Sequence, residues 1–355
     1  MKLLIALEGK LNQGPNIGTN ILFNELLKNY NKNTNKIHIV ETTNIKSLIH
    51  AILHLRKYDV FHFYSESPGA SLLFILFKIF GKKVVYTLHG NIFIESKSKP
   101  WPISKLWVPS HLFVIKNANA VIFPTKYLET QINEYLKTKK HTKTTNHHVI
   151  PNGIYIEKYD KELILKKADK LKEIQNGNAS LNILSITSFV FEQKTLGVDL
   201  LINVNKLLND RGIKTELKIA GIGKKLPMYK NKYESEKIKF LGYCNNKTEN
   251  QWADLFIHLS YLDNLPYVIL NAGASGIPTI ASNIGGIPEI FTKSSDNKVW
   301  GLTNNDPETI ADNIQKLIQD KDFYYDVSQK QYENIKENFN IEKISNQIWN
   351  LYLSL

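Results

Sequence analysis

Short apolar runs alternate with stretches of helical spacing through the first half of the sequence. The apolar runs predict buried strands at residues 3–7, 37–40, 60–63, 83–88, 120–123 and 148–150. Between them, apolar residues recur with the period of a helix at residues 20–29, 45–55, 71–80, 104–116 and 127–136. Strands that alternate with helices in this way predict a parallel, doubly wound sheet.

The same alternation begins again in the second half of the chain. Pro151-Asn152-Gly153 is a turn signal, and the polar, Lys-rich stretch from there to about Ser180 is interpreted as a linker. Strands are then predicted at residues 181–186, 217–220, 238–241, 255–259 and 279–281, and helices at 307–318, from 322 onwards and near 341–353. We therefore expect two α/β domains, residues 1–165 and 166–340, and a terminal helix at 341–355.

The segment 263–282 carries the strongest chemical signal. It is interpreted as a polar loop, a short helix, a Gly-Ile-Pro turn and a buried strand, and Pro266 suits the first helical turn. The N–H groups of such a helix start form an anion site. Tyr267 and Asn271 lie four apart, hence on one helix face. An acid in the loop (Asp263), a phosphate-binding helix end and a polar helix residue together suit a nucleoside diphosphate. The residues predicted to bind it here are Asn264, Leu265, Pro266, Tyr267, Val268 and Asn271.

This segment resembles the signature of the retaining, nucleotide-sugar-dependent glycosyltransferases of the GT-B fold, family four. The family has an acid, seven intervening residues, a second acid, a helix of small residues, Gly-x-Pro and a strand. Asp263 takes the first acid position, and the resemblance places it against the donor sugar. Asn271 stands where the family usually has a Glu that holds the ribose hydroxyls. Asn donates and accepts hydrogen bonds but carries no charge, so weaker nucleotide binding is implied.

The resemblance extends to other strand ends. Lys194 matches a lysine that holds the donor diphosphate, whereas Ser188 and Phe189 stand where the family has Gly and a second cation, Arg. The turns at Gly221 and Gly242 match turns whose backbone contacts the nucleotide. The implied architecture is two Rossmann-like domains with a cleft between them, with the terminal helix packing back on the first domain.

His89 follows a predicted strand in Thr87-Leu88-His89-Gly90. Ligands of open α/β sheets bind beyond the carboxyl ends of the strands, so His89 is at the functional end, and the resemblance places it beside the donor sugar. Gly18, in a glycine-containing loop with Gly14, is predicted to let backbone amides approach a phosphate.

His62 lies inside a predicted strand, where a packed histidine and a site residue are equally good interpretations. Together with Glu66 and Ser67, just past that strand, it is a candidate to line an acceptor pocket.

Composition limits the class of protein. With 43% hydrophobic and 22% charged residues in 355, the chain has an ordinary globular composition. The single cysteine, Cys244, fits a reducing compartment. The apolar start is too short for a signal peptide, and no run approaches the roughly 18 apolar residues of a transmembrane helix. These features predict a cytoplasmic protein, peripheral at most on the inner face of the membrane.

Positive charge is concentrated in the first half. Residues 1–160 hold 21 Lys and Arg against 10 Asp and Glu, whereas residues 161–355 hold 24 against 23. Basic stretches at 136–143 and 97–107 lie in the first half, and the second interleaves Lys with Trp, which is typical of membrane interfaces. We expect docking on an anionic membrane rather than on nucleic acid, for which no motif is present; a solvated basic face is the remaining alternative.

The resemblance implies a retaining glycosyltransferase that uses a UDP- or GDP-sugar, no cofactor and no metal. Together with the charge of the first half, it predicts an acceptor that is lipid-linked or a precursor of a cell-surface glycan. Asp263 and His89 would be the catalytic residues of the enzyme. Two alternatives stay open: a sugar-nucleotide epimerase of the same architecture, and a weakly active partner subunit of a glycosyltransferase.

Overall fold

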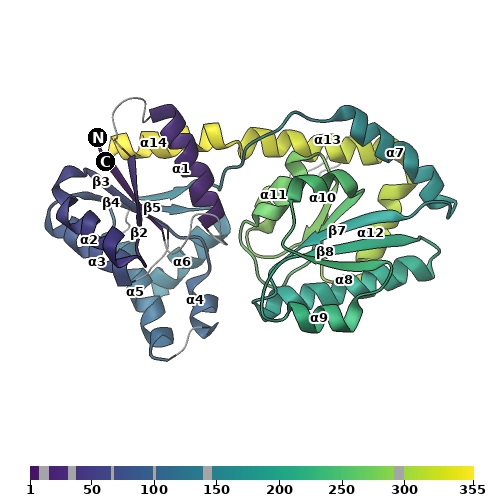
Figure 1. The fold of residues 1–355 in the computed structure, drawn as a ribbon, viewed down its shortest axis with the longest axis horizontal. Coiled ribbons are helices and arrows are strands. Elements are labelled where there is room, and N and C mark those ends of the chain that lie inside the picture. The colour runs from purple at the N-terminus through teal and green to yellow at the C-terminus, as the bar shows by residue number, and fades with distance from the viewer. Residues whose placement is uncertain (8–15, 31–36, 65–67, 99–100, 139–145, 292–299) are drawn as a thin grey trace. The chain divides into compact units, whose positions relative to one another are not determined.

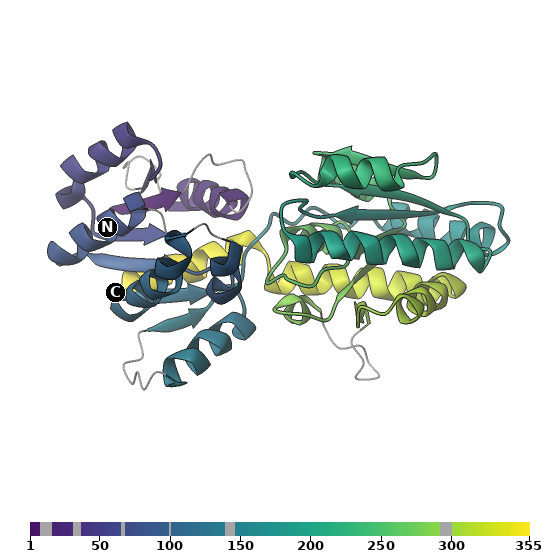
Figure 2. The same cartoon turned by 90° about the horizontal axis from the view of Figure 1, so that it is seen from below.

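The computed structural model describes residues 1–7, 16–30, 37–64, 68–98, 101–138, 146–291 and 300–355. The chain divides into two compact units (Figures 1 and 2). The first contains Met1–Tyr155 together with Phe339–Leu355, and the second contains Ile156–Asn338. Each unit holds a parallel sheet flanked by helices, so the predicted α/β fold class is confirmed.

The first unit is built on a six-stranded sheet in the order β2-β1-β3-β4-β5-β6, with every pair parallel. Its strands are β1 (Leu3–Leu7), β2 (Ile37–Glu41), β3 (Val60–Phe63), β4 (Lys83–Thr87), β5 (Ala120–Phe123) and β6 (His147–Val149). All six were predicted, with ends that differ by at most one residue. The strands β3 and β5, neither of which is at an edge of the sheet, are buried at every position, because helices cover both faces of the sheet.

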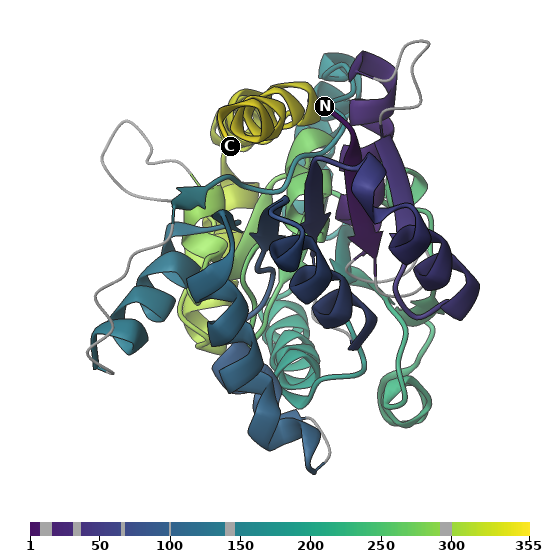
Figure 3. The ribbon, with the colours of Figure 1, turned by 90° about the vertical axis from the view of Figure 1, so that its left-hand side faces the viewer.

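The helices of the first unit form two groups on opposite sides of its sheet (Figures 1 and 3). Helix α1 (Asn16–Tyr30) and the terminal helix α14 (Ile341–Ser354) pack on one face, where Leu22, Leu26, Ile344 and Ile348 are buried. The other face is covered by α2 (Ile45–Leu53), α3 (Pro68–Ile79), α5 (Ile103–Asn117) and α6 (Lys126–Thr138); the short α4 (Ile92–Glu95) follows β4. The terminal helix therefore belongs to the first unit.

The second unit is built on a six-stranded parallel sheet in the order β12-β11-β10-β7-β8-β9. Its strands are β7 (Leu181–Ile186), β8 (Thr215–Ala220), β9 (Ile238–Gly242), β10 (Leu255–His258), β11 (Thr279–Ser282) and β12 (Leu302–Thr303). Its helices are α7 (Lys161–Gln175), α8 (Glu192–Asp210), α9 (Leu226–Tyr233), α10 (Asn246–Trp252), α11 (Tyr267–Ala274), α12 (Pro307–Gln319) and α13 (Lys321–Asn338). The strand β12, only two residues long, was not predicted.

The interpretation of the stretch up to Ser180 as a linker is wrong. Most of it forms α7, which Asp160 caps by accepting a hydrogen bond from the Leu163 N–H at 3.0 Å. Ile164, Ala168, Leu171 and Ile174 are buried along one face of this helix. The lysines of this helix, of which Lys167 is itself buried, gave the segment a polar composition that concealed its helical period.

The predicted boundary after residue 165 also differs from the observed one. The second unit begins at Ile156, since residues just after it are fixed to α13. The Tyr159 hydroxyl lies 2.9 Å from the Ser328 hydroxyl, and the Tyr332 hydroxyl donates to the Glu157 carbonyl oxygen at 2.9 Å.

Candidate active site

The sheet of the second unit reverses its winding between β7 and β10. From β7 the chain continues through α8 to β8 on one side, and from β10 it continues through α11 to β11 on the other. The loops that leave these two neighbouring strands therefore diverge, and open α/β sheets bind their ligands beyond the carboxyl ends of the strands at such a point. The candidate residues Lys194 and Asp263 come from these two connections.

Lys194 and Asp263 form an ion pair, with Nζ 2.8 Å from Oδ2. Lys194 lies in the first turn of α8, and Asp263 lies in the loop between β10 and α11. Gly197 allows α8 to pack this close to the loop, because a Cβ there would stand 1.8 Å from the Leu259 carbonyl oxygen. The structure thus brings together two residues that are 69 positions apart in the sequence.

His258, at the end of β10, completes this cluster and was missed by the sequence analysis. Its Nε2 lies 3.0 Å from Asp263 Oδ2 and its Nδ1 lies 3.2 Å from the Ile186 carbonyl oxygen. Because a carbonyl only accepts hydrogen bonds, Nδ1 must donate to it. The available signal was a histidine at the last position of an otherwise apolar strand, five residues before the acid.

Asp263 is ionised in this setting. Burial raises the pKa of its carboxyl group, but the Lys194 ammonium and the hydrogen bond from His258 lower it more, and the net result lies well below the usual range. Its other oxygen, Oδ1, accepts the Asn264 N–H at 3.1 Å. The site therefore presents a fixed negative charge beside a fixed positive one.

The amino end of α11 provides hydrogen-bond donors next to this pair. Pro266 precedes the first helical residue in an extended conformation, so it lies one position earlier than predicted. Within the described part of the chain, the structure records no acceptor for the backbone N–H groups of Tyr267 and Val268. These N–H groups and the positive end of the helix dipole suit an anionic ligand.

Asn271 lies one turn into α11 and is half-buried. Its carbonyl oxygen accepts hydrogen bonds from the Ser275 hydroxyl at 2.9 Å and from Asn250 Nδ2 at 3.3 Å. Among the described residues, no hydrogen bond is recorded for its side-chain amide. That amide is available to a ligand.

The turns at Gly221 and Gly242 lie next to each other, joined by a 2.7 Å hydrogen bond from the Gly221 N–H to the Gly242 carbonyl oxygen. Gly221 has a φ of 141°, and a Cβ there would stand 1.8 Å from the Thr187 carbonyl oxygen. Only glycine fits this close approach of the loops after β7 and β8.

Phe189 occupies the core, not the site. Its side chain is fully buried, and its ring centroid lies 5.7 Å from that of Tyr229 and 6.1 Å from that of Phe240. Its backbone N–H also donates to the Ile222 carbonyl oxygen at 3.0 Å. The position that corresponds to the second phosphate-binding cation thus holds a packing residue.

In the first unit, His89 follows β4 and stacks on Tyr64 with ring centroids 5.5 Å apart. Burial lowers the pKa of His89 to about 4, so its ring is neutral at pH 7. Gly18 lies inside α1, which begins at Asn16 rather than at the predicted residue 20. The roles of both residues toward a donor stay predictions.

His62 is a core residue of the first unit. It is fully buried in β3, with Nδ1 2.5 Å from the Tyr352 hydroxyl and Nε2 2.8 Å from the Thr87 hydroxyl. The structure thus favours the packed interpretation over an acceptor contact. The other predicted acceptor residues, Glu66 and Ser67, lie outside the described residues, as do Gly14 and most of the basic stretch 136–143.

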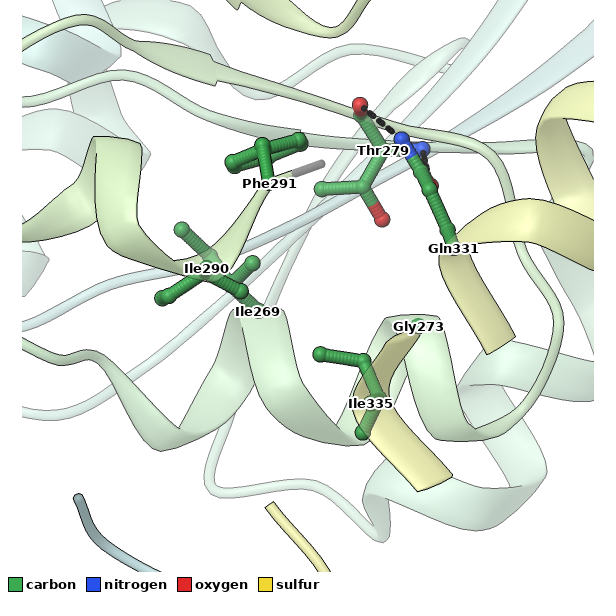
Figure 4. Close-up of a pocket in the computed structure, with 7 residues that line it drawn as sticks. All are labelled: Ile269, Gly273, Thr279, Ile290, Phe291, Gln331 and Ile335. Carbon is green, nitrogen blue, oxygen red and sulfur yellow. Dashed lines mark hydrogen bonds between the residues drawn. The ribbon is translucent and has the colours of Figure 1, made fainter. Parts of the chain in front are cut away.

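A small apolar cavity lies elsewhere in the second unit, between α11, β11 and α13 (Figure 4). Its one amide side chain, Gln331, is bonded to the backbone of Thr279, accepting from its N–H at 2.9 Å and donating to its carbonyl oxygen at 3.1 Å. The cavity has no free polar group and is a packing feature. It is lined by Ile269, Gly273, Thr279, Ile290, Phe291, Gln331 and Ile335.

Two family models match the chain. Glycosyltransferase Family 4 matches residues 30–158, and Glycosyl transferases group 1 matches residues 182–338. The chain belongs to the family 4 glycosyltransferases. The resemblance found in the segment that starts at Asp263 is therefore confirmed, and with it the GT-B fold.

Curated relatives and solved structures agree with this assignment. The chain is 23% identical to N-acetyl-alpha-D-glucosaminyl L-malate synthase of Bacillus anthracis, over 83% of this glycosyltransferase and 74% of that protein. It is 26% identical to the UDP-Gal:alpha-D-GlcNAc-diphosphoundecaprenol alpha-1,3-galactosyltransferase of Escherichia coli, over 88% of this chain and 80% of that protein. The crystal structure of Anabaena HepE in complex with UDP-glucose matches with a TM-score of 0.70 at 17% identity, covering 100% of both chains.

Proposed function

We propose that this glycosyltransferase transfers a sugar, with retention of configuration, from a UDP- or GDP-sugar to a membrane-presented precursor of a cell-surface glycan, without a metal ion. The observation that carries the proposal is the Lys194–Asp263 pair beside the open amino end of α11. The pair offers one cation for a diphosphate and one carboxylate for sugar hydroxyls. The enzyme would act at the cytoplasmic face of a membrane.

Donor binding follows from the charges in the second unit. The N–H groups of Tyr267 and Val268 and the Lys194 ammonium would bind the diphosphate oxygens. The Asp263 carboxylate would accept hydrogen bonds from the sugar, while the Asn271 amide would meet the ribose. Because Phe189 is buried, Lys194 would be the one cation supplied from the start of α8.

The transfer step would need no protein nucleophile. The acceptor hydroxyl would attack the anomeric carbon on the face from which the diphosphate leaves. The bond from the anomeric carbon to the phosphate oxygen breaks, the bond to the acceptor oxygen forms, and the acceptor proton passes to the leaving phosphate. Lys194 and the helix N–H groups would stabilise the negative charge that develops on that phosphate.

The acceptor class is suggested by a relative and by charge. The name of the Escherichia coli relative specifies a diphosphoundecaprenol-linked acceptor, which is a lipid. The excess of positive charge in residues 1–160 of this chain suits an anionic membrane surface. No helix in the described part of the chain is long and apolar enough to cross a membrane.

A donor panel tests the proposal. The full chain is incubated with UDP- and GDP-sugars, with and without a polyprenyl-diphosphate-linked acceptor, and release of nucleoside diphosphate is measured. Release that rises with acceptor, and an NMR coupling constant showing the donor's anomeric configuration in the product, are expected. An epimerised sugar nucleotide without transfer, or no turnover unless a second protein is added, would support one of the two alternatives instead. Turnover that disappears with EDTA and returns with Mg²⁺ would overturn metal independence.

A further inference from the structure

Three helices on one face of the first sheet carry apolar side chains on the side turned away from the core. In α2, Ala51 faces the core, whereas Ile45, Ile49 and Leu53 recur every fourth residue and are exposed, Ile45 by 73% and Leu53 by 76%. This spacing forms a row along one side of the helix. The inner and outer sides of α2 are therefore both apolar.

Helices α3 and α5 repeat this arrangement. Leu72, Ile75 and Ile79 are exposed on α3, whose Leu73, Phe74 and Phe77 are buried in the core. On α5, Ile103 and Leu106 are exposed, Leu106 by 64%. We call the exposed apolar side chains of α2, α3 and α5 the apolar face.

Ring contacts link the three helices that carry the apolar face. The Phe74 ring of α3 meets the Phe113 ring of α5 with centroids 5.9 Å apart. The Arg56 guanidinium, just after α2, lies 5.6 Å from the Phe80 ring centroid, just after α3. Several exposed apolar side chains on neighbouring helices favour an interaction site, because soluble proteins rarely gather them on one surface.

The three helices that carry the apolar face have charged side chains of one sign. Residues 44–57, 68–83 and 101–120, which contain the three helices, include no Asp or Glu. An anionic occupant is therefore favoured. The same stretches include Lys46, Arg56, Lys57, Lys78, Lys105 and Lys116.

A lipid surface fits these features better than a second copy of the chain. A symmetric dimer through this face would set the same basic residues of each copy against each other, which costs electrostatic energy. An anionic bilayer neutralises the lysines at headgroup level while the apolar rows enter the acyl boundary. Trp101, 76% exposed beside the start of α5, suits the same interface.

We propose that the apolar face inserts into the headgroup region of an anionic membrane. This extends the proposed function, on whose membrane-presented acceptor it rests, by naming the docking surface. The binding is part hydrophobic and part electrostatic, and it is located on α2, α3 and α5 rather than on the basic stretch 136–143.

Vesicle flotation with the full chain tests this docking. The vesicles are phosphatidylcholine alone or mixed with phosphatidylglycerol, and the variant combines Leu53→Gln, Ile79→Gln and Leu106→Gln. These side chains are mostly exposed, so the fold should tolerate the changes. The matched control is Leu353→Gln with Leu165→Gln, which removes exposed leucines from α14 and α7. Bromine-labelled lipids report insertion of Trp101 through quenching that Trp101→Phe removes.

We expect wild type and control to bind the anionic vesicles, and the triple variant to bind at least about tenfold more weakly. Equal binding of the triple variant and wild type would overturn the proposal, as would equal recovery with neutral vesicles. So would self-association that the triple variant abolishes, measured by sedimentation velocity, without vesicle binding. Nucleotide-sugar hydrolysis without vesicles, measured in parallel, tests the proposed function separately, because it needs only the donor site.

Discussion

His258 Nε2 lies 3.0 Å from Asp263 Oδ2, and the same ring donates through Nδ1 to the Ile186 carbonyl oxygen. The imidazole thus links the Asp263 carboxylate to the backbone of β7, the neighbouring strand. With His258 only 2% exposed, this arrangement fixes the carboxylate between an imidazole and the Lys194 ammonium.

The first prediction concerns His258 as a positioning residue for Asp263. His258→Leu is expected to lower kcat by at least about tenfold, the value of one charge-assisted hydrogen bond. His258→Gln keeps an N–H donor near the Nε2 position and should retain more activity than the leucine variant. Equal kcat values for the folded His258→Leu and His258→Gln variants would show that the ring only fills space.

The second prediction concerns the Lys194–Asp263 pair. Asp263→Asn is expected to lower turnover at least about tenfold, because the donor sugar loses a charged acceptor. Lys194→Gln should weaken binding of the nucleoside diphosphate, measured by calorimetry. The loss of activity in the double variant should be smaller than the sum of the losses in the two single variants, since the two residues contact each other.

A matched control for that pair is available in the same helix. Asp199 on α8 accepts hydrogen bonds from the hydroxyls of Tyr229 and Tyr233, at 2.6 Å and 2.5 Å. Asp199→Asn is thus an acid-to-amide change with structural partners only, and it should leave the turnover per folded molecule unchanged. A loss equal to that of Asp263→Asn would mean that the assay reports stability and not chemistry.

The third prediction concerns Phe189, which stands where the resemblance to the family implies a phosphate-binding Arg. Phe189→Arg is expected to destabilise the second unit by about 3 kcal/mol or more and not to strengthen donor binding, because it buries an unpaired charge between Tyr229 and Phe240. Val190→Arg, at the next, exposed position, is the control and should be tolerated. Urea unfolding measures the free energy of unfolding of both variants and of wild type. A stable Phe189→Arg variant that binds the nucleoside diphosphate more tightly would show that the side chain can turn into the site.

These residues show what the sequence could and could not predict. The parallel strands were predictable because each is a short apolar run between turn signals, as in β10 and β11. Helix α7 was missed since its lysines hide four buried residues at helical spacing. Asp263 and Lys194 were found through a local motif. His258 was not, because its role depends on a contact with Ile186 of the neighbouring strand, and no local pattern encodes that contact.

The fourth prediction concerns Asn271, whose side-chain amide is available on α11. Asn271→Glu places a carboxylate where the ribose hydroxyls are expected, and it should tighten binding of the nucleoside diphosphate by about tenfold. Asn271→Gln lengthens the side chain without charge and is the control. Weaker binding of the Glu variant in calorimetry would mean that the pocket is shaped around Asn or that this residue does not meet the ribose.

The fifth prediction concerns acid stability of the first unit. Burial, with a smaller contribution from His89, lowers the pKa of His62 from 6.5 to about 3. Because the unfolded chain binds the proton more readily between these values, the free energy of unfolding is highest above pH 6.5 and falls as the pH drops toward 3. The loss should be about 1.4 kcal/mol per pH unit for this one group.

The His62→Gln variant tests the direction of this pH dependence directly. The variant loses the contacts with Tyr352 and Thr87, so its free energy of unfolding should be lower than that of wild type above pH 7. Between about pH 4 and 6, the free energy of unfolding of the variant should change less steeply with pH than that of wild type. The difference should correspond to the uptake of one proton on unfolding. Above pH 7 the two curves should run parallel. Urea unfolding over this pH range provides the measurement. Equal slopes below pH 6 would mean that His62 accepts its proton without leaving the core, and that its two hydroxyl partners stabilise the charged ring as well as the neutral one.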